Sequence, residues 1–586
     1  MPIKILTNEF HKNVKNNNKN LMKNFLLICL LVLAVKVTAQ KSGDVKALAK
    51  PSNVQFEWHE QERIMFIHFG IATWLGQEYD EQGNFDLKRI NPTNLNTDEW
   101  CETAKLWGAK EIIFVAKHVG GFCWWPTRTT EYCVRNIPWK NGKGDLLKEI
   151  STSCKKAGLN LGVYIYPGDV SFGAGIGSGG KTADPSLQTE YNKVYRQQLL
   201  EVLANYGQMM EVWFDGNCVI DVNDILEKYA KKSVIFQSKQ ASIRWPGTES
   251  GKLSYPAWNT VSSEKLITGL TTQYDDDPNG DAWAPLESNL PLYNHNWFWN
   301  PTNESKRRSL DELMEVYYKS VGYGSVMLLN STPDTTGKIP YGDRLIYKKL
   351  GDEINRRFNK AEDSILNKLG SVVQVNLKKP TPINHIVWGE DYRMGHRIRA
   401  YQLAGKINGQ WKTLIEGTSV GRKKIDPFET TEVTAVKLTI TKFAATPSIK
   451  YLKLYNVKNY ELPVSQKEMA QWTNCGNWDT KTFENGRDTI DVDLSFYIQQ
   501  PGQYEVKFLQ DVVVTGANVK DAIIEIDHQN TLQTYLIRKG NDLFYINRTA
   551  QISINSATKI RFIVESDNQS FQNRGRFVIR KRVINE

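Results

Sequence analysis

The sequence contains few cysteines, and their positions predict neither a metal site nor a disulfide framework. It has 7 cysteines in 586 residues, and no two of them form a Cys-x-x-C pair. Cys29 lies in an apolar run near the N-terminus, and the others are scattered at positions 101, 123, 133, 154, 218 and 475. Structural zinc sites need closely spaced Cys and His ligands. We therefore expect a protein that needs no metal and no cofactor.

A long hydrophobic run is also missing, since no apolar stretch reaches the ~20 residues that a membrane-spanning helix requires. The apolar run at residues 25–35 follows a lysine-rich segment and precedes the small residues Thr38 and Ala39. This order is typical of a signal peptide, which we predict at residues 1–39. We expect an exported protein, periplasmic or secreted, without stable membrane insertion.

No basic stripe interleaved with aromatic residues is visible, and no nucleic-acid-binding motif is present. The formal charge of +10 comes partly from lysines before residue 25, within the predicted signal peptide. We therefore expect no nucleic-acid partner. The sequence also lacks a G-x-G-x-x-G motif after its first predicted strand, which argues against an open dinucleotide-binding sheet.

The composition is that of a folded soluble chain, with 40% hydrophobic and 24% charged residues. Its length predicts several domains at ~150 residues each. The 17 Trp and 25 Tyr residues are compatible with sugar binding, because aromatic faces pack well on sugar rings. They could equally fill cores and interfaces.

Short apolar runs alternate with longer helical patterns in the first part of the chain. This alternation indicates repeated βα units around a parallel sheet. We predict a (β/α)8-like TIM barrel over residues 50–365, because the units fit a closed barrel better than an open sheet. The predicted strands are residues 64–69, 111–117, 159–166, 210–214, 233–238, 257–261, 296–299 and 325–329, and the predicted helices include 98–107, 191–205 and 310–321.

Beyond the barrel, the pattern changes to short strand-like runs separated by turn residues, without long helical stretches. This texture predicts two all-β sandwich domains, at residues 370–460 and 465–586.

Polar residues end the first four predicted strands. They are His68, His118, the pair Tyr164 and Tyr166, and Asp215. Catalytic groups of a (β/α) barrel come from the carboxyl ends of its strands. One such residue is more often structural, and Asp215 could simply cap the next helix. Their convergence on one face favours an active site.

Asp215 is the strongest candidate for a nucleophile, because Trp213 and Phe214 beside it would partly remove its carboxylate from water. Glycoside hydrolysis needs a second carboxyl group, and retention of configuration requires the two to lie ~5 to 5.5 Å apart. The sequence gives no distance between them.

Several motifs of residues 50–360 resemble glycoside hydrolase family 29, the retaining α-L-fucosidases. The matching words are Phe-Ile-His-Phe-Gly at 66–70, Ala-Lys-His at 116–118, Trp-Lys-Asn-Gly-Lys-Gly-Asp at 139–145, Trp-Phe-Asp-Gly at 213–216 and Leu-Leu-Asn at 328–330. The resemblance implies an exo-acting enzyme that releases terminal α-L-fucose from fucosylated oligosaccharides or glycoconjugates. It also implies that Asp215 forms the covalent glycosyl-enzyme and that His68 and His118 bind fucose hydroxyls. We further expect Tyr164, Tyr166, Trp213 and Trp299 to contact the sugar.

The chain departs from this family at Val119 and Gly120, which replace a second His and an Asp in the usual Lys-His-His-Asp-Gly-Phe word. The change leaves α-L-galactosidase-like activity open as an alternative. A non-catalytic glycan-binding protein is a further alternative, although the presence of Asp215 argues against it.

Two glutamates compete for the role of general acid/base. Glu249 lies in Arg-Trp-Pro-Gly-Thr-Glu-Ser-Gly at 244–251, which is similar to a word of the family branch that acts on α-1,3/4-linked fucose, where this Glu is the proton donor. Glu287 lies in another family-like word at 283–287 and could instead hold the sugar. We favour Glu249. A neighbouring Trp and the charge of Asp215 would raise its pKa, and Arg244 would oppose the rise if it were close.

Residues 383–388, 397–403 and 436–440 resemble the discoidin, or factor 5/8 type C, module that often follows this catalytic domain. In some cases such modules bind galactose-type sugars, which implies a glycan-binding or stabilising role here.

Overall fold

The computed structural model describes residues 47–293 and 296–460, and beyond residue 460 it describes only the strands given below. The predicted signal peptide at 1–39 lies outside the described residues.

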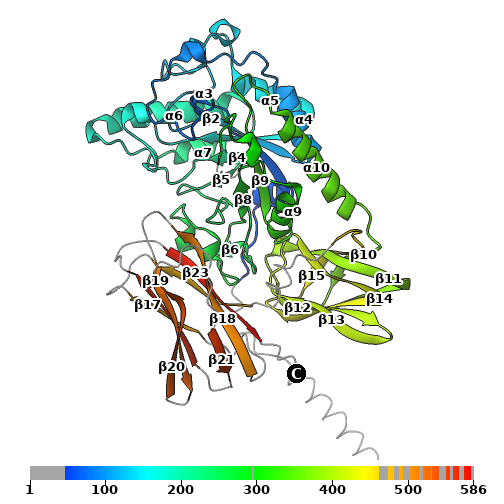
Figure 1. The fold of residues 1–586 in the computed structure, drawn as a ribbon. Helices are drawn as coiled ribbons and strands as arrows, with labels where there is room; N and C mark the ends of the chain where they lie inside the picture. The colour runs from blue at the N-terminus through cyan, green and yellow to red at the C-terminus, as the bar shows by residue number, and fades with distance from the viewer. Residues whose placement is uncertain are drawn as a thin grey trace, which may run out of the picture. The chain divides into compact units, whose positions relative to one another are not determined.

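The first domain is built on a curved parallel sheet of 7 strands in the order β5-β4-β3-β2-β1-β9-β8 (Figure 1). Its first five strands are β1 (Arg63–Ile67), β2 (Glu111–Lys117), β3 (Asn160–Ile165), β4 (Glu211–Trp213) and β5 (Val234–Phe236), and the others are β8 (Glu287–Leu290) and β9 (Val326–Ser331). Strands β1 to β5 confirm the first five strands predicted from the sequence. The apolar runs were visible because parallel strands are buried on both faces.

The last predicted strand, residues 325–329, is confirmed as β9, whereas the two predicted strands before it differ from the structure. Residues 257–261 contain only the short β6 (Thr260–Val261), which pairs antiparallel with β7 (Ala282–Trp283) outside the main sheet. Residues 296–299 form no strand. The structure instead contains β8, a short strand of Glu-Ser-Asn-Leu. Its polar residues interrupt the apolar pattern from which strands were predicted.

Two isolated parallel bridges lie between the sheet edges, joining Phe236 to Ile243 and Arg244 to Leu286. They follow β5 and precede β8, so a single stretch of chain occupies the position of an eighth strand. The described residues thus form a curled parallel sheet of 7 strands, and the full barrel stays a prediction.

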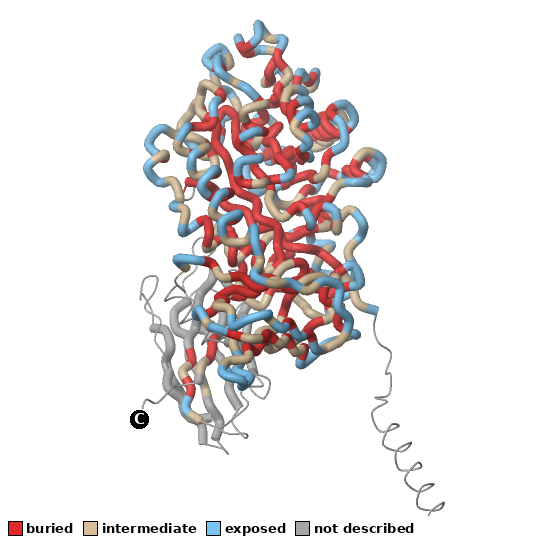
Figure 2. The backbone as a smooth tube through the Cα atoms, turned by 90° about the vertical axis from the view of Figure 1, so that its right-hand side faces the viewer, coloured by how far each residue is buried: buried red, intermediate tan, exposed pale blue. Residues whose placement is uncertain are grey.

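The parallel sheet lies between two hydrophobic cores. In β1, Ile64 and Phe66 belong to the core inside the curve, whereas Met65 and Ile67 belong to the core between sheet and helices. Side chains alternate because successive residues of a strand point to opposite faces. Figure 2 shows buried backbone, in red, running through the middle of the described residues. Continuing the inner register past β1 leads to His68, and past β4 to Asp215.

The longer helices of this domain pack their apolar sides on the outer core, whereas Trp58 of the first helix belongs to the inner core. In α5, Asp145 caps the N-terminus by accepting a hydrogen bond from the backbone N–H of Lys148, and Gly158 ends the helix in the left-handed conformation. The helices are α2 (Asn53–His59), α3 (Ile71–Leu75), α4 (Thr97–Leu106), α5 (Leu146–Ala157), α6 (Gln188–Asn205), α7 (Asn223–Tyr229), α8 (Ser263–Leu266), α9 (Leu310–Lys319) and α10 (Tyr341–Phe358).

An all-β region follows α10, with strands joined in one antiparallel sheet of 6 in the order β10-β15-β11-β14-β12-β13. Trp388, Tyr401 and Leu403 are among the residues of its own hydrophobic core. The strands are β10 (Asp363–Leu369), β11 (Val372–Glu390), β12 (Ile398–Ile407), β13 (Gln410–Gly417), β14 (Lys424–Phe443) and β15 (Ser448–Tyr455).

The C-terminal region contains two four-stranded antiparallel sheets, in the orders β16-β23-β18-β21 and β17-β22-β19-β20. Sheets of this kind agree with the predicted sandwich class, while the exact domain limits stay predictions. The strands are β16 (Thr473–Thr480), β17 (Arg487–Val492), β18 (Gly502–Val513), β19 (Val519–His528), β20 (Thr531–Lys539), β21 (Ala550–Ile554), β22 (Lys559–Ser566) and β23 (Asn573–Lys581).

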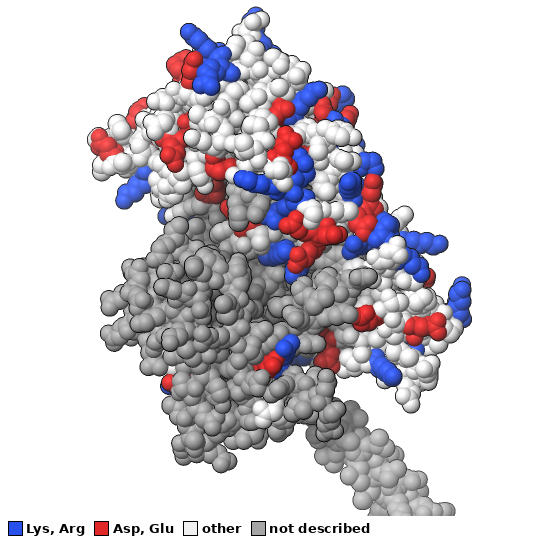
Figure 3. All heavy atoms as spheres, in the orientation of Figure 1, with Lys and Arg blue, Asp and Glu red and all other residues white. Residues whose placement is uncertain are grey.

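Basic and acidic side chains are intermixed on the face of the described residues drawn in Figure 3. None of the helices within the described ranges is long and apolar enough to cross a membrane.

Candidate active site

Asp215 lies two residues beyond β4, on the inner register of the sheet. Its backbone has φ +56°, in the left-handed region that a residue other than glycine seldom adopts. The backbone N–H of Gly216 donates a hydrogen bond to the side chain of Gln237, just beyond β5. The hydroxyl of Tyr164 donates to Asp215 Oδ2 at 2.8 Å. Neighbouring strand ends therefore fix the carboxylate in one orientation.

The surroundings of Asp215 favour its protonated form. Desolvation is the largest cause that raises the pKa of Asp215 to about 6; the Tyr164 hydrogen bond lowers this pKa and the charge of Glu249 raises it. Asp215 is nevertheless an exposed residue by surface area. Solvent therefore reaches Asp215 although its surroundings are close, as a residue that must meet a substrate requires.

Replacing Tyr164 with phenylalanine is expected to move the acidic limb of kcat/KM to higher pH. A nucleophilic Asp215 must be ionised, so activity rises with pH through its pKa. Because the Tyr164 hydroxyl lowers that pKa, its loss raises it. The measurement is kcat/KM against pH with an aryl fucoside. An unmoved acidic limb would contradict the assignment of that limb to Asp215.

His68 and His118 are both held as neutral imidazoles. Burial is the main cause that lowers the pKa of His68 to about 3 and the pKa of His118 to about 4. His68 Nδ1 lies 2.7 Å from Asn330 Oδ1, and Asn330 Nδ2 donates to the carbonyl of Trp297 at 2.8 Å. The amide orientation makes His68 Nδ1 the donor and leaves Nε2 as an acceptor. His118 Nδ1 is buried without a hydrogen-bond partner among the described residues. Neutral imidazoles with free nitrogens suit the binding of sugar hydroxyls.

Aromatic rings from successive strands and loops form a stack beside Asp215. His118 stacks on Tyr164 with centroids 5.7 Å apart and an interplanar angle of 19°. Tyr164 stacks on Trp213 at 5.9 Å and 27°, and Trp213 on Phe236 at 3.7 Å and 2°. At the outer end, Tyr79 stacks on His118 at 5.9 Å and 19°. The stack holds Tyr164, which donates the hydrogen bond to Asp215, in place.

Tyr79 and Glu78 were not identified from the sequence as site residues. Tyr79 is 43% exposed, and burial, then the charges of Asp215 and Glu249, raise its pKa. Glu78 accepts hydrogen bonds from Asn296 Nδ2 at 3.0 Å and from the backbone N–H of Trp297 at 2.6 Å. Both lie in an irregular loop after α3, and no local pattern marks such a loop as functional.

Glu249 lies within electrostatic reach of the proposed nucleophile, since its charge contributes to the raised pKa of Asp215. The residue is exposed. The guanidinium of Arg244 is buried and is used by other partners. It donates hydrogen bonds to the carbonyls of Ala284, Thr272 and Trp258, and it forms an ion pair with Asp276 at 2.9 Å. The cation of the motif thus has a structural role and leaves Glu249 free to act.

Glu287 is completely buried at the start of β8. Trp213 Nε1 donates to its Oε1 at 2.9 Å. Burial is the main cause that raises the pKa of Glu287 to about 8, and the pKa of the neighbouring Glu211 is raised well above its usual value by burial and by Glu287. Glu211 Oε1 and Glu287 Oε2 have no donor from other described residues, so a proton on one carboxyl group joins the pair. This location is beneath Trp213, away from solvent.

The fold is expected to become less stable as pH rises, because the folded protein holds a proton on Glu287 that the unfolded chain releases. Its pKa in the folded protein, about 8, lies above the usual 4.5. Stability from this proton is complete below pH 4.5 and is lost as pH rises through about 8, at up to about 1.4 kcal/mol per pH unit. A Glu287→Gln variant keeps the neutral shape, so its thermal midpoint should fall less between pH 5 and pH 8. Parallel curves for both proteins would refute this expectation.

The remaining predicted sugar contacts divide in two. Tyr166 is 5% exposed and stacks on Tyr164 at 6.4 Å and 14°, so it belongs to the site. Trp299 instead donates to Glu304 at 3.3 Å. Its neighbours Trp297 and Phe298 contact His68, with centroids 5.1 Å and 5.2 Å away.

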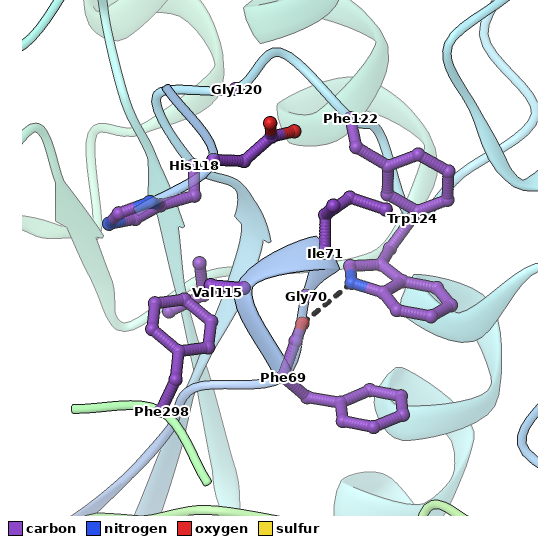
Figure 4. A pocket seen from close by; sticks show the side chains of 11 residues that line it. Phe69, Gly70, Ile71, Val115, His118, Gly120, Phe122, Trp124 and Phe298 are labelled. Atoms are coloured by element: carbon purple, nitrogen blue, oxygen red, sulfur yellow. Dashed lines mark hydrogen bonds between the residues drawn. The ribbon is translucent and has the colours of Figure 1, made fainter. Parts of the chain in front are cut away.

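A small cavity of about 20 Å³, enough for little more than one water molecule, adjoins His118. Figure 4 shows His118 and Phe298 on one side and Phe122 and Trp124 on the other, with the Trp124 indole donating to the carbonyl of Phe69 at 2.6 Å. Gly120 and Asp80 also line it. Val119 is buried in the inner core. Among the described residues, no three His, Cys, Asp or Glu side chains are arranged to bind a metal ion.

The chain is similar to known proteins over most of its length. Residues 47–356 match the family model described as alpha-L-fucosidase. The chain is 28% identical over 480 residues to Alpha-L-fucosidase 1 of Arabidopsis thaliana, which covers 74% of this chain and 92% of the relative. A Bacteroides thetaiotaomicron protein provisionally assigned as an α-L-fucosidase has a TM-score of 0.65 and 34% identity, covering 70% of this chain and 100% of its own. A glycoside hydrolase 29 family member from an unknown rumen bacterium has a TM-score of 0.63 and 26% identity, covering 89% and 97%.

Proposed function

Because this chain belongs to the α-L-fucosidase family and is a glycoside hydrolase of family 29, we propose that it releases terminal α-L-fucose with retention of configuration. In this proposal Asp215 is the nucleophile and Glu249 the acid/base. The observation that carries it is the Asp215 carboxylate, fixed by Tyr164 and open to solvent, within electrostatic reach of Glu249.

The chemistry requires two displacements at the anomeric carbon. Ionised Asp215 attacks this carbon while the bond to the leaving oxygen breaks and Glu249 gives that oxygen its proton. Glu249, now ionised, then takes a proton from water, whose oxygen displaces Asp215. His68 and His118 bind the sugar hydroxyls as neutral partners. Glu287 stays protonated beneath Trp213 and does not take part.

The substrate class follows from the motif that contains Glu249. We propose that the enzyme acts on α-1,3- and α-1,4-linked fucose in oligosaccharides or glycoconjugates. The test compares α-1,3/4-, α-1,2- and α-1,6-fucosylated oligosaccharides with p-nitrophenyl α-L-fucoside. Proton NMR of the first product should reveal α-L-fucose before mutarotation. Initial β-L-fucose would refute retention, and absence of turnover on every substrate would refute the activity.

A second candidate substrate is an α-L-galactoside, which differs from a fucoside by a hydroxyl on C6. The departure from the family word at Val119 and Gly120 favours it, because the second His and the Asp of that word, which contact the sugar, are missing. If the site admits this group, kcat/KM for p-nitrophenyl α-L-galactoside should approach the value for the fucoside. A fucoside preference of several hundredfold would rule it out.

We also propose that the protein is exported, on the basis of its N-terminal segment, and that residues 370–460 are a discoidin-like module that binds glycans or stabilises the enzyme. Fractionation of expressing cells tests export. Glycan-array binding by the full-length Asp215→Asn variant tests the module, provided that free fucose does not compete.

A further inference from the structure

Gly120 is confined by a carboxylate from another loop. An ideal Cβ at Gly120 would lie 2.3 Å from Asp80 Oδ2 and 2.5 Å from Asp80 Cγ. Real Cβ atoms do not approach other heavy atoms so closely. Gly120 does not have a positive φ, so its backbone would accept a side chain. The three nearest atoms to this Cβ all belong to the Asp80 side chain, which is therefore the main constraint.

Asp80 is itself fixed and nearly inaccessible, with 4% exposure. Its Oδ1 accepts a hydrogen bond from the backbone N–H of Gly83 at 3.0 Å, and its Oδ2 accepts one from the Tyr132 hydroxyl at 2.8 Å. The contact is mutual, because a Cβ at Gly83 would lie 2.9 Å from the carbonyl oxygen of Gly120. The loop after α3 and the loop after β2 are thus locked together by one buried carboxylate.

This contact lies next to two rings of the active site. Tyr79 directly precedes Asp80, and His118 lies two residues before Gly120. The two rings stack at 5.9 Å and 19°. The charges of Asp215 and Glu249 both raise the pKa of Tyr79. A change in the spacing of the two loops would therefore change the position of both rings relative to these carboxylates.

We propose that Asp80 is a positioning residue that, by filling the space of a side chain at position 120, sets the Tyr79–His118 pair for sugar binding. The inference rests on the proposed function and deepens it. It gives a physical reason for the glycine at position 120: the departure from the family word at this position is coupled to a carboxylate from another loop.

The sharpest test is a double-variant cycle. Gly120→Ala is expected to lower kcat/KM on p-nitrophenyl α-L-fucoside by roughly 10- to 100-fold, because small displacements of positioned groups cost up to about 100-fold. Asp80→Gly removes the three atoms that lie nearest to this Cβ. The double variant Asp80→Gly/Gly120→Ala should therefore be at least about tenfold more active than Gly120→Ala alone.

Gly121→Ala is the matched control. Gly121 has φ +86°, and its Cβ would lie 2.6 Å from Asp169 Oδ1 rather than from Asp80. Its loss of activity should not be relieved by Asp80→Gly. Equal relief at positions 120 and 121, or purely additive effects at 80 and 120, would overturn the proposal.

Two further readouts separate positioning from general stability. Asp80→Ala should raise KM and the Kd of free fucose more than it lowers kcat, with Asp80→Asn between Asp80→Ala and wild type because its amide oxygen still accepts a hydrogen bond. A loss of kcat alone, or a loss that follows the thermal midpoint, would refute a positioning role. An inactive wild type would instead refute the proposed function, since the cycle is interpreted only with an active enzyme.

Discussion

Replacing Asp215 with alanine or asparagine is expected to leave a folded protein whose kcat on p-nitrophenyl α-L-fucoside is lower by roughly 10³-fold or more. Glu287 cannot replace Asp215 in forming the glycosyl intermediate, because Glu287 is completely buried beneath Trp213. Asparagine retains an oxygen that accepts the Tyr164 hydrogen bond. Folding can be verified by the thermal midpoint.

Azide makes this expectation specific. With Asp215→Ala, azide can occupy the space of the missing carboxylate and attack the anomeric carbon directly, which gives the β-L-fucosyl azide by inversion. Asp224→Asn is the control, because Asp224 follows the same strand but its side chain is 67% exposed and pairs with Arg196 at 2.7 Å, a surface interaction of small energy. Near-normal turnover by a folded Asp215 variant would exclude it as the nucleophile.

Removing the carboxyl group of Glu249 is expected to slow cleavage of natural fucosylated oligosaccharides by roughly 10²- to 10⁴-fold, the usual contribution of general acid/base catalysis. Aryl fucosides with activated leaving groups need little protonation, so the first displacement should be affected much less. Azide should then intercept the glycosyl-enzyme and give the α-L-fucosyl azide with net retention. Product stereochemistry therefore distinguishes the two carboxylates.

Glu287→Gln is the control for Glu249→Gln. Both changes replace a carboxyl group by an amide, but one lies at the exposed side of the site and the other in the interior. Only Glu249→Gln should show dependence of rate on the leaving group. If Glu287→Gln shows that dependence and Glu249→Gln does not, the two roles must be exchanged.

The sequence predicted the first half of the sheet because β1 to β5 are apolar runs between helical segments. It did not predict β8, since Glu287 and Asn289 interrupt the apolar pattern. Their polarity is explained by partners far along the chain: Trp213 Nε1 donates to Glu287 and Trp245 Nε1 donates to Asn289. Such pairing is a tertiary effect that no local period contains.

The candidate site was predictable to a similar extent. His68, His118, Tyr164 and Asp215 end strands, so period and topology place them on one face. The sequence could not show that Asp215 and Glu249 lie near each other, because Glu249 lies in an irregular segment. Asp80 was also missed, because its contact with Gly120 depends on the path of two loops.

The division of each strand between two hydrophobic cores has a consequence for protein engineering. Positions such as Met65 and Ile67 face the helices, whereas Ile64 and Phe66 face the interior beneath the site. A library randomised at the helix-facing positions should therefore yield variants that differ in thermal tolerance but share one substrate range. A library at the adjacent inward positions should yield altered selectivity, so that neighbouring codons of one strand evolve under different selection.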